Sequence, residues 1–162
     1  MTNLGLEAAL ARRGVALVRT PVGDRHVQAR LRAGGLTLGG EPSGHLILAR
    51  RFSGGDGLLA GLFLLQVLAR TGRTPAELLE GYRPYPSKIF NLRADRKPAL
   101  DSLPAVVQLR ERVDSRPDGR GRTVIRYSGT EPLLRILVEA SDLEELVGEI
   151  TPLISEIEAA LR

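Results

Sequence analysis

Residues 126–132, with the sequence RYSGTEP, have the composition of a loop that grips a phosphate dianion. Arg126 offers a planar fork of donors that matches two phosphate oxygens. Ser128 and Thr130 offer hydroxyl groups. Gly129 lets the backbone approach an anion closely and can adopt a left-handed turn that presents amides to it. A plain hairpin turn of small polar residues is the alternative interpretation.

Glu131 is the unusual residue in this loop, because a carboxylate repels phosphate. We expect it to meet a hydroxyl or an amine of a ligand, or to pair with a nearby arginine such as Arg135. Apolar, strand-like sequence flanks the loop on both sides. The loop therefore predicts a ligand class, whereas the rest of the composition does not.

A second loop, residues 39–45 with the sequence GGEPSGH, suits a sugar. The Glu41 carboxylate can accept hydrogen bonds from two vicinal hydroxyls, and Ser43 can add a further bond. His45 can donate, accept or transfer a proton. The alternative is a surface loop between two strands with a solvated glutamate and histidine.

Two further glycine turns carry charged residues. In residues 22–26, Arg25 could place a cation near an anionic substrate, or Asp24 could cap a helix and form an ion pair. Asp56, in the sequence GGDG, is expected to be a helix N-cap, since the segment matches neither a Walker loop nor a dinucleotide fingerprint. With no cysteine and two histidines in the chain, no zinc cluster is expected, and no metal site is predicted.

The composition is that of a folded protein, with 43% hydrophobic and 26% charged residues. The net charge of +4 comes from scattered arginines, and aromatics make up 4% of the chain, so no nucleic-acid partner is expected. The most apolar run, residues 58–69, is too short to span a bilayer. The N-terminus does not read as a signal peptide. These features predict a cytoplasmic protein without a membrane partner.

The chain is expected to form two domains, at 1–80 and 88–162, joined by a proline-rich linker at 81–87. The first mixes strands and helices and reads as part of an α/β domain. The second reads as a small α+β domain, an antiparallel sheet with helices on one face. In the first we expect helices at 3–14, 25–32, 58–70 and 76–80 and strands at 15–18, 36–40 and 46–49.

In the second domain we expect strands at 88–93, 123–127 and 133–139 and a turn at 117–119. Asp101 or Ser102 should cap a helix that carries Pro104 in its first turn. A last helix should begin at a capping box of Ser141 and Glu144. Pro152 should kink or split that helix. The helix at 58–70 is apolar nearly all round, which predicts burial inside a domain.

Taken together, the motifs resemble the α-D-phosphohexomutase superfamily, and within it the bacterial phosphoglucosamine mutase branch. Each motif is weak alone, whereas their colinear combination is specific. The Gly-Asp-Arg and Ser-Gly-Thr-Glu-Pro versions favour this branch over a phosphoglucomutase or phosphomannomutase fragment. The matching stretches cover essentially the whole chain, at residues 1–7, 22–25, 39–45, 55–57 and 126–132.

The resemblance implies the later part of the third of four domains plus the whole fourth. It implies that Glu41 and Ser43 bind sugar hydroxyls, that His45 is implicated in proton handling, and that Arg25 helps to orient the sugar phosphate. Two positions depart from the family pattern, Pro42 where Gln, Met or Glu is usual and His26 where Tyr is usual. The implied phosphate clamp consists of Arg126, Ser128, Gly129 and Thr130.

Family members carry a phosphoserine and a Mg²⁺-binding Asp-Gly-Asp-x-Asp-Arg loop, and neither motif occurs in these 162 residues. The resemblance therefore implies a C-terminal fragment that binds phosphosugar but no metal and is inactive alone. The full enzyme would interconvert glucosamine 6-phosphate and glucosamine 1-phosphate, for amino-sugar nucleotide and cell-wall precursor synthesis. A stand-alone sugar-phosphate or anion-binding module is the alternative. Apolar surface at 58–68, if exposed, should cause self-association.

Overall fold

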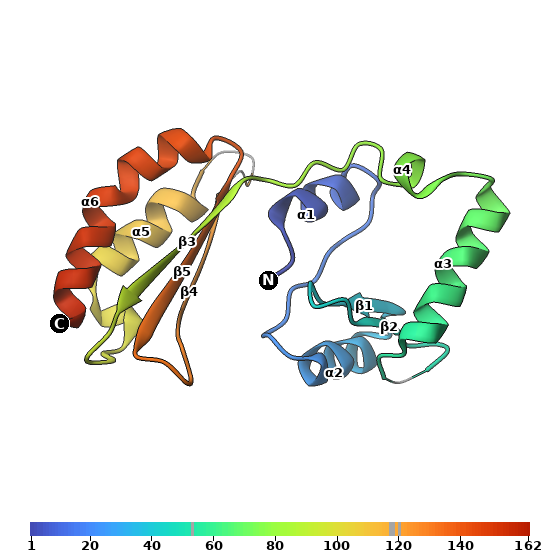
Figure 1. Ribbon diagram of the computed structural model, residues 1–162, viewed down its shortest axis with the longest axis horizontal. Coiled ribbons are helices and arrows are strands. Elements are labelled where there is room, and N and C mark those ends of the chain that lie inside the picture. The colour runs from blue at the N-terminus through green and yellow to red at the C-terminus, as the bar shows by residue number, and fades with distance from the viewer. Residues whose placement is uncertain (53, 117–118, 120) are drawn as a thin grey trace. The chain divides into compact units, whose positions relative to one another are not determined.

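The structure is a computed structural model that describes residues 1–52, 54–116, 119 and 121–162 (Figure 1). Its contacts divide the chain into two compact units. One unit comprises Met1–Thr2 and Leu6–Arg83, and the other comprises Asn3–Gly5 and Pro84–Arg162. Two residues of the turn predicted at 117–119 lie outside the described residues, so that prediction stays open.

The first unit is built on a β-hairpin and the helix that covers it. Strands β1 (Leu38–Gly40) and β2 (Leu46–Leu48) pair antiparallel, with Gly40 opposite Leu46. Ile47 of β2 packs against Val27 and Leu31 of helix α2 (Asp24–Gly34) in a small core. The other helices here are α1 (Leu4–Ala11), α3 (Gly57–Thr71) and α4 (Pro75–Leu78).

The strand predicted at 15–18 does not form. All four residues are described, and they have no regular structure. Val15 and Val18 are exposed to solvent. A strand needs a neighbour for its backbone hydrogen bonds, and among the described residues this segment has none.

Helix α3 forms as predicted, but the prediction that it is buried is wrong for this chain. None of its residues, all of which the structure describes, is buried. Leu58, Leu62 and Leu65 are 76%, 57% and 61% exposed. The hairpin and α2 form too small a surface to cover it. The expected exposure of apolar surface in this segment is therefore confirmed.

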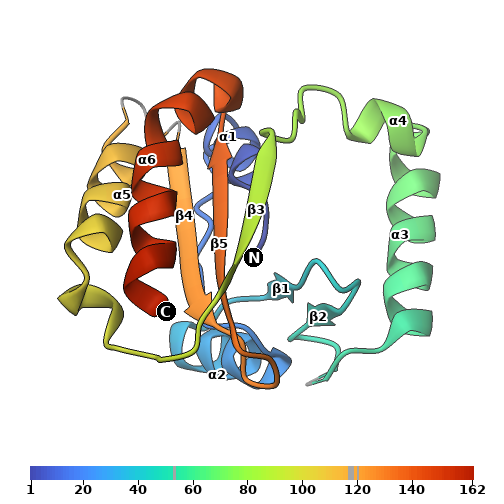
Figure 2. The ribbon, with the colours of Figure 1, turned by 60° about the vertical axis from the view of Figure 1, so that its left-hand side comes forward.

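The second unit is a three-stranded antiparallel sheet with its helices on one face (Figures 1 and 2). The strand order is β3-β5-β4, so the apolar β5 lies in the centre. This is the α+β arrangement that the sequence predicts. The elements are β3 (Ser87–Arg93), a 3₁₀ turn η1 (Leu100–Ser102), α5 (Pro104–Asp114), β4 (Gly121–Tyr127), β5 (Leu133–Ala140) and α6 (Leu143–Leu161).

Alternation along β5 explains why the helices lie on one face. Leu134, Ile136 and Val138 are fully buried and belong to one core with α5 and α6. Every second residue of a strand points to the same face, so Arg135 and Leu137 point to the other one. The face that carries Arg135 is thus the one that α5 and α6 do not cover. Along β5 this face holds the half-buried Arg135 as well as Leu137 and Glu139, which are buried.

The predicted helix starts in this unit are wrong in detail. Helix α5 begins after Leu103, without a side-chain cap, and Asp101 and Ser102 belong to η1. The capping box of Ser141 and Glu144 does not form, because the N-cap of α6 is Asp142, whose side chain makes no capping bond.

Pro152 does not split the last helix. Helix α6 runs unbroken over 19 residues. Ile150 and Ile154, on either side of the proline, are buried in the core. Tertiary packing of this apolar face stabilises the helix more than the proline destabilises it.

A buried carboxylate ties Asn3–Gly5 to the second unit. Glu139 of β5 accepts a hydrogen bond from the Leu4 amide at 3.0 Å and pairs with Arg122 at 2.8 Å. The side-chain oxygen of Asn3 accepts from the amides of Gly5 and Tyr85 at 2.8 and 2.9 Å. Asn3 therefore caps α1, as predicted.

In the described part of the chain, no helix is long and apolar enough to cross a membrane.

Candidate functional site

The predicted phosphate loop connects β4 to β5, and its own hydrogen bonds close it. The Ser128 amide donates to the Leu133 carbonyl at 2.8 Å, and the Leu133 amide donates to the Glu131 carbonyl at 2.8 Å. The Glu131 amide donates to the Ser128 hydroxyl oxygen at 3.2 Å. The loop is thus tightly folded without any ligand.

Ser128 has a structural role in this loop. It is 5% exposed, and its hydroxyl lies 3.5 Å from the Glu131 carboxylate in addition to the amide contact. Direct donation from Ser128 to phosphate stays a prediction. Gly129 and Thr130 are exposed at the tip of the loop.

Gly129 does not adopt the left-handed conformation that is available to a glycine at this position. Its φ angle is not among the positive values of the glycines that the structure describes. A Cβ atom at Gly129 would meet nothing within 4 Å, so the site has room for a ligand. The open space, rather than a special backbone angle, distinguishes this glycine.

Arg126 and Arg135 lie directly opposite each other on neighbouring strands. Residues opposite each other in an antiparallel pair share a face, and like charges there repel. Arg135 pairs with Glu131, as predicted. Within the described part of the chain, no hydrogen bond or ion pair engages the Arg126 side chain. An anion between the two guanidinium groups would relieve the repulsion and fill the free fork of Arg126.

Arg135 is a functional candidate that the sequence analysis considered only as a partner of Glu131. A signal for it exists in the sequence. Once residues 129–132 are assigned to a four-residue hairpin loop closed by Ser128 and Leu133, the pairing of the strands places Arg135 opposite Arg126.

The predicted sugar loop connects β1 to β2 in the first unit. The Glu41 amide donates to the His45 carbonyl at 2.9 Å, and the Gly44 amide donates to the Glu41 carbonyl at 3.0 Å. Gly44 has a φ of 94°, a conformation that favours glycine. The tight turn brings the side chains of Glu41, Ser43 and His45 together.

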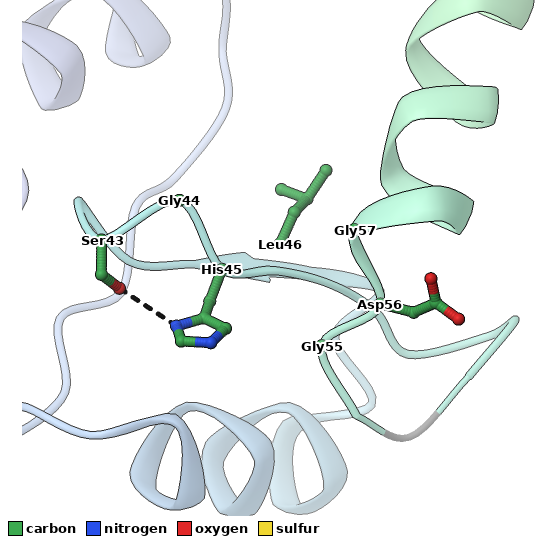
Figure 3. A pocket seen from close by; sticks show the side chains of 7 residues that line it. All are labelled: Ser43, Gly44, His45, Leu46, Gly55, Asp56 and Gly57. Carbon is green, nitrogen blue, oxygen red and sulfur yellow. Dashed lines mark hydrogen bonds between the residues drawn. The ribbon is translucent and has the colours of Figure 1, made fainter.

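Those side chains form a connected polar group. The Glu41 carboxylate accepts from the Gly23 amide at 3.1 Å and lies 3.8 Å from Nδ1 of His45. The Ser43 hydroxyl lies 3.1 Å from the same Nδ1 (Figure 3). Glu41 is thus half-buried and fixed by a backbone donor, while His45 is exposed and is the member of the group that can exchange a proton.

The turn before α2 supplies the remaining predicted residue. Arg25 is exposed, and its Nε lies 3.3 Å from Nε2 of His26. Gly23, not Asp24, is the N-cap of α2, with a φ of 122° and no side-chain cap. The prediction of an Asp24 cap is therefore wrong. The Gly23 amide donates to the Glu41 carboxylate, so the turn that carries Arg25 is bonded to the sugar loop two residues before Arg25.

A cavity of about 300 Å³ opens beside His45 (Figure 3). Asp56 lies on its far side and accepts from the Leu59 amide at 2.9 Å, which confirms it as the N-cap of α3. A Cβ atom at Gly55 would come within 3.2 Å of the His45 ring. The cavity has the polar wall that a hydroxylated ligand needs, and it is lined by Ser43, Gly44, His45, Leu46, Gly55, Asp56 and Gly57.

Replacing Gly39 with alanine should disturb the packing of strand β1, which leads into this loop, against helix α2. A Cβ atom there would lie 2.5 Å from the Val27 side chain and 3.0 Å from that of Leu31. We expect a loss of about 1–3 kcal/mol in the free energy of unfolding, measured by urea denaturation. Gly61→Ala is the matched control, because its Cβ meets nothing within 4 Å. Equal stability of the two variants would contradict the close packing of the hairpin on α2.

A magnesium ion finds no fit in this chain as far as the structure describes it. No group of three or more His, Cys, Asp or Glu side chains converges among the described residues.

Two family models match the chain. One, described as phosphoglucomutase/phosphomannomutase, alpha/beta/alpha domain III, matches residues 1–85. The other, phosphoglucomutase/phosphomannomutase, C-terminal domain, matches residues 90–152. The two matches agree with the order of the two loops along the chain.

Curated relatives carry the name phosphoglucosamine mutase. The protein of Rhodospirillum centenum is 44% identical over 162 residues, which is 99% of this chain and 34% of that protein. The protein of Methylibium petroleiphilum is 49% identical over 142 residues, 88% of this chain and 31% of that protein. The chain thus spans about a third of the length of these relatives.

Solved structures share the fold. An N-acetylphosphoglucosamine mutase from Aspergillus fumigatus matches with a TM-score of 0.72 at 20% identity, covering 99% of this chain and 37% of the other. A structure of the same enzyme with GlcNAc-6P and magnesium matches with a TM-score of 0.51 at 24% identity, covering 68% of this chain and 22% of the other.

Proposed function

This chain belongs to the phosphoglucomutase/phosphomannomutase family, and on that premise we propose that it carries the sugar and phosphate loops of a phosphoglucosamine mutase. The whole enzyme would interconvert glucosamine 6-phosphate and glucosamine 1-phosphate. The facing pair of Arg126 and Arg135, beside the exposed loop tip, is the observation that carries the proposal. Two cations on one face, one of them without a protein partner in the described chain, suit a phosphate dianion.

Each loop has a separate task in this proposal. Arg126 and the loop tip bind whichever phosphate is not reacting. The Glu41 carboxylate accepts hydrogen bonds from ring hydroxyls, and the Ser43 hydroxyl donates a further one. His45 moves a proton at a sugar oxygen. Arg25 adds a positive charge for the sugar phosphate. The Gly23 amide supports this assignment by holding the Glu41 carboxylate at 3.1 Å.

The transfer itself requires residues that the 162-residue sequence does not contain. A phosphoserine would supply the phosphoryl group, and Mg²⁺ would neutralise charge on it. The A. fumigatus enzyme was crystallised with magnesium and GlcNAc-6P, which supports a metal in the whole enzyme. We infer that this chain alone binds phosphosugar without turning it over.

Complementation tests the proposal. The chain is mixed with a separately expressed segment that carries the phosphoserine and Mg²⁺ loops of a phosphoglucosamine mutase. Mutase activity in the mixture, with none in either part, supports the proposal. Persistent inactivity together with tight phosphosugar binding would instead favour a stand-alone binding module.

We also propose that α3 makes the chain self-associate. Leu58, Leu62 and Leu65 follow one another at helical spacing, and all are exposed. No charged residue occurs between Leu58 and Val67. A second copy can therefore cover this face without burying a charge, and apolar area removed from water contributes about 25 cal/mol per Å².

Substituting Leu62→Glu together with Leu65→Glu should reduce the mass of the particle. Charges in a buried apolar contact are strongly unfavourable. We therefore expect the double variant to be a monomer and the unsubstituted chain to form a particle of higher mass. Analytical ultracentrifugation at several concentrations measures the mass. Leu79→Glu is the control, since Leu79 is equally exposed but lies outside α3. A monomeric unsubstituted chain would contradict the proposal.

A further inference from the structure

A short segment between β3 and η1 is bonded to the phosphate loop at three places. The Ala94 amide donates to the Pro132 carbonyl at 2.8 Å. The Tyr127 hydroxyl donates to the Pro98 carbonyl at 2.8 Å. Between these two, Nζ of Lys97 donates to the Ser128 carbonyl at 3.1 Å. The segment 94–98 therefore runs along the loop and contacts both of its ends.

The same segment is also fixed on its other side. The Asp95 amide donates to the Leu161 carbonyl at 3.0 Å, and Nε of Arg96 donates to the Ala160 carbonyl at 2.9 Å. These carbonyls belong to the last turn of α6, where no intrahelical donor is available. Leu161 itself is buried. Lys97 is thus presented to the loop from a segment anchored to the core.

Tyr127 reinforces the position of Lys97. Nζ of Lys97 lies 6.0 Å from the centroid of the Tyr127 ring, at the limit of a cation–π contact. Burial raises the pKa of Tyr127, so the phenol keeps the proton that it donates to Pro98. The ring stays neutral and compatible with a neighbouring ammonium group.

The bond from Lys97 to Ser128 has a consequence for the next amide. The peptide bond between Ser128 and Gly129 is trans, as are all those that the structure describes. In a trans peptide the C=O and N–H groups point in opposite directions. Because Lys97 holds the Ser128 carbonyl, the Gly129 N–H points away from Lys97. No hydrogen bond within the described residues uses this N–H group.

We propose that Lys97 is a positioning residue that fixes the Ser128 carbonyl and thereby aims the Gly129 amide at a phosphate monoester. This inference rests on the proposed function of the loop. Lys97 uses one of its three N–H donors for the carbonyl, and its positive charge remains at the site. The two contributions, an oriented amide and a nearby cation, act together on the same anion.

The sequence provides its own control for this proposal. Lysine occurs at two positions only, Lys88 and Lys97, whereas the other basic residues are arginines. Lys88 also lies over an aromatic ring, with Nζ 5.1 Å from the Phe90 centroid. It sits at the start of β3, opposite Val138, far along the strands from Leu133 and the loop. Lys88→Met therefore removes the same charge from the same unit without touching the loop.

The test follows the Gly129 amide directly. The full chain, labelled with ¹⁵N, is titrated with inorganic phosphate and with glucosamine 6-phosphate. In the unsubstituted chain we expect the Gly129 cross-peak to move on binding. In Lys97→Met we expect about tenfold weaker binding, on the scale of a charged hydrogen bond, and a much smaller shift of this cross-peak. Lys97→Arg should restore both, and Lys88→Met should change neither.

The outcomes separate this inference from the function on which it rests. A Lys97→Met variant with unchanged affinity and an unchanged Gly129 shift would overturn the positioning role and leave the phosphate loop intact. Absence of binding in the unsubstituted chain would overturn the loop's function first. Unchanged cross-peaks of buried residues such as Ile136 show whether Lys97→Met keeps the fold, and Lys97→Gln serves as a second variant.

Discussion

Replacing Arg126 with alanine is expected to weaken the binding of glucosamine 6-phosphate by about 1.5–3 kcal/mol, the scale of a hydrogen bond to a charged group. This corresponds to roughly 10- to 150-fold in the dissociation constant. Arg126 lies on the face of the sheet that α5 and α6 do not cover, and no described residue forms a hydrogen bond or ion pair with its guanidinium group. Its donors are therefore available to a ligand without breaking an existing ion pair. Isothermal calorimetry with the full chain measures the change.

The control for this experiment is another arginine on the same unit. Arg110 of α5 pairs with Asp101 on the helical side of the sheet. Arg110→Ala changes the net charge by the same amount, so it reports the effect of long-range electrostatics alone. We expect it to change affinity little at physiological salt, where screening acts within about 8 Å. Equal losses in both variants, or no loss in Arg126→Ala, would contradict the clamp.

The sequence predicted the second unit well because its elements pack on one another. Leu134, Ile136 and Val138 alternate along β5, and the apolar residues of α5 and α6 recur at helical spacing. The core that these patterns imply is the core that forms. The helix start at Ser141 was not predictable in this way, because Asp142 is drawn into an ion pair with Arg116 from the end of α5.

The first unit shows the opposite case. The apolar pattern at 15–18 predicts a strand, and that of α3 predicts burial, but neither pattern identifies the element that would pair with the segment or cover it. The strand partner that 15–18 would need is absent among the described residues, and α3 remains exposed in this chain. Where the covering elements are present, apolar side chains are buried, as for Val27 and Leu31 of α2, which pack against the hairpin.

The residues of the candidate site also fall into two groups, those that a contiguous sequence motif identifies and those that only the fold brings together. The loop residues Arg126 and Glu41 were recognisable because their motifs are contiguous. Arg135 follows from the register of β4 and β5, which the hairpin length fixes. Lys97 could not be predicted, since 31 positions separate it from Ser128 and only the folded unit brings them together.

A second large effect is expected from Leu109→Ala. Leu109 of α5 is fully buried in the core of the second unit. Deleting three of its carbons leaves a cavity, so we expect a loss of about 2–5 kcal/mol in the free energy of unfolding. Urea denaturation followed by far-UV circular dichroism measures the loss. The expected change is in the midpoint of the transition and not in its slope.

Leu79→Ala makes the same chemical change on a side chain that is 61% exposed and lies outside α3. We expect it to alter stability by no more than about 0.5 kcal/mol, because few contacts are lost at the surface. Similar losses in both variants would mean that burial is not what stabilises the second unit. The core also supports β4 and β5, which carry Arg126 and Arg135. Below the unfolding transition of Leu109→Ala, phosphate affinity should therefore stay close to that of the unsubstituted chain, since the register that aligns the two arginines persists while the unit is folded.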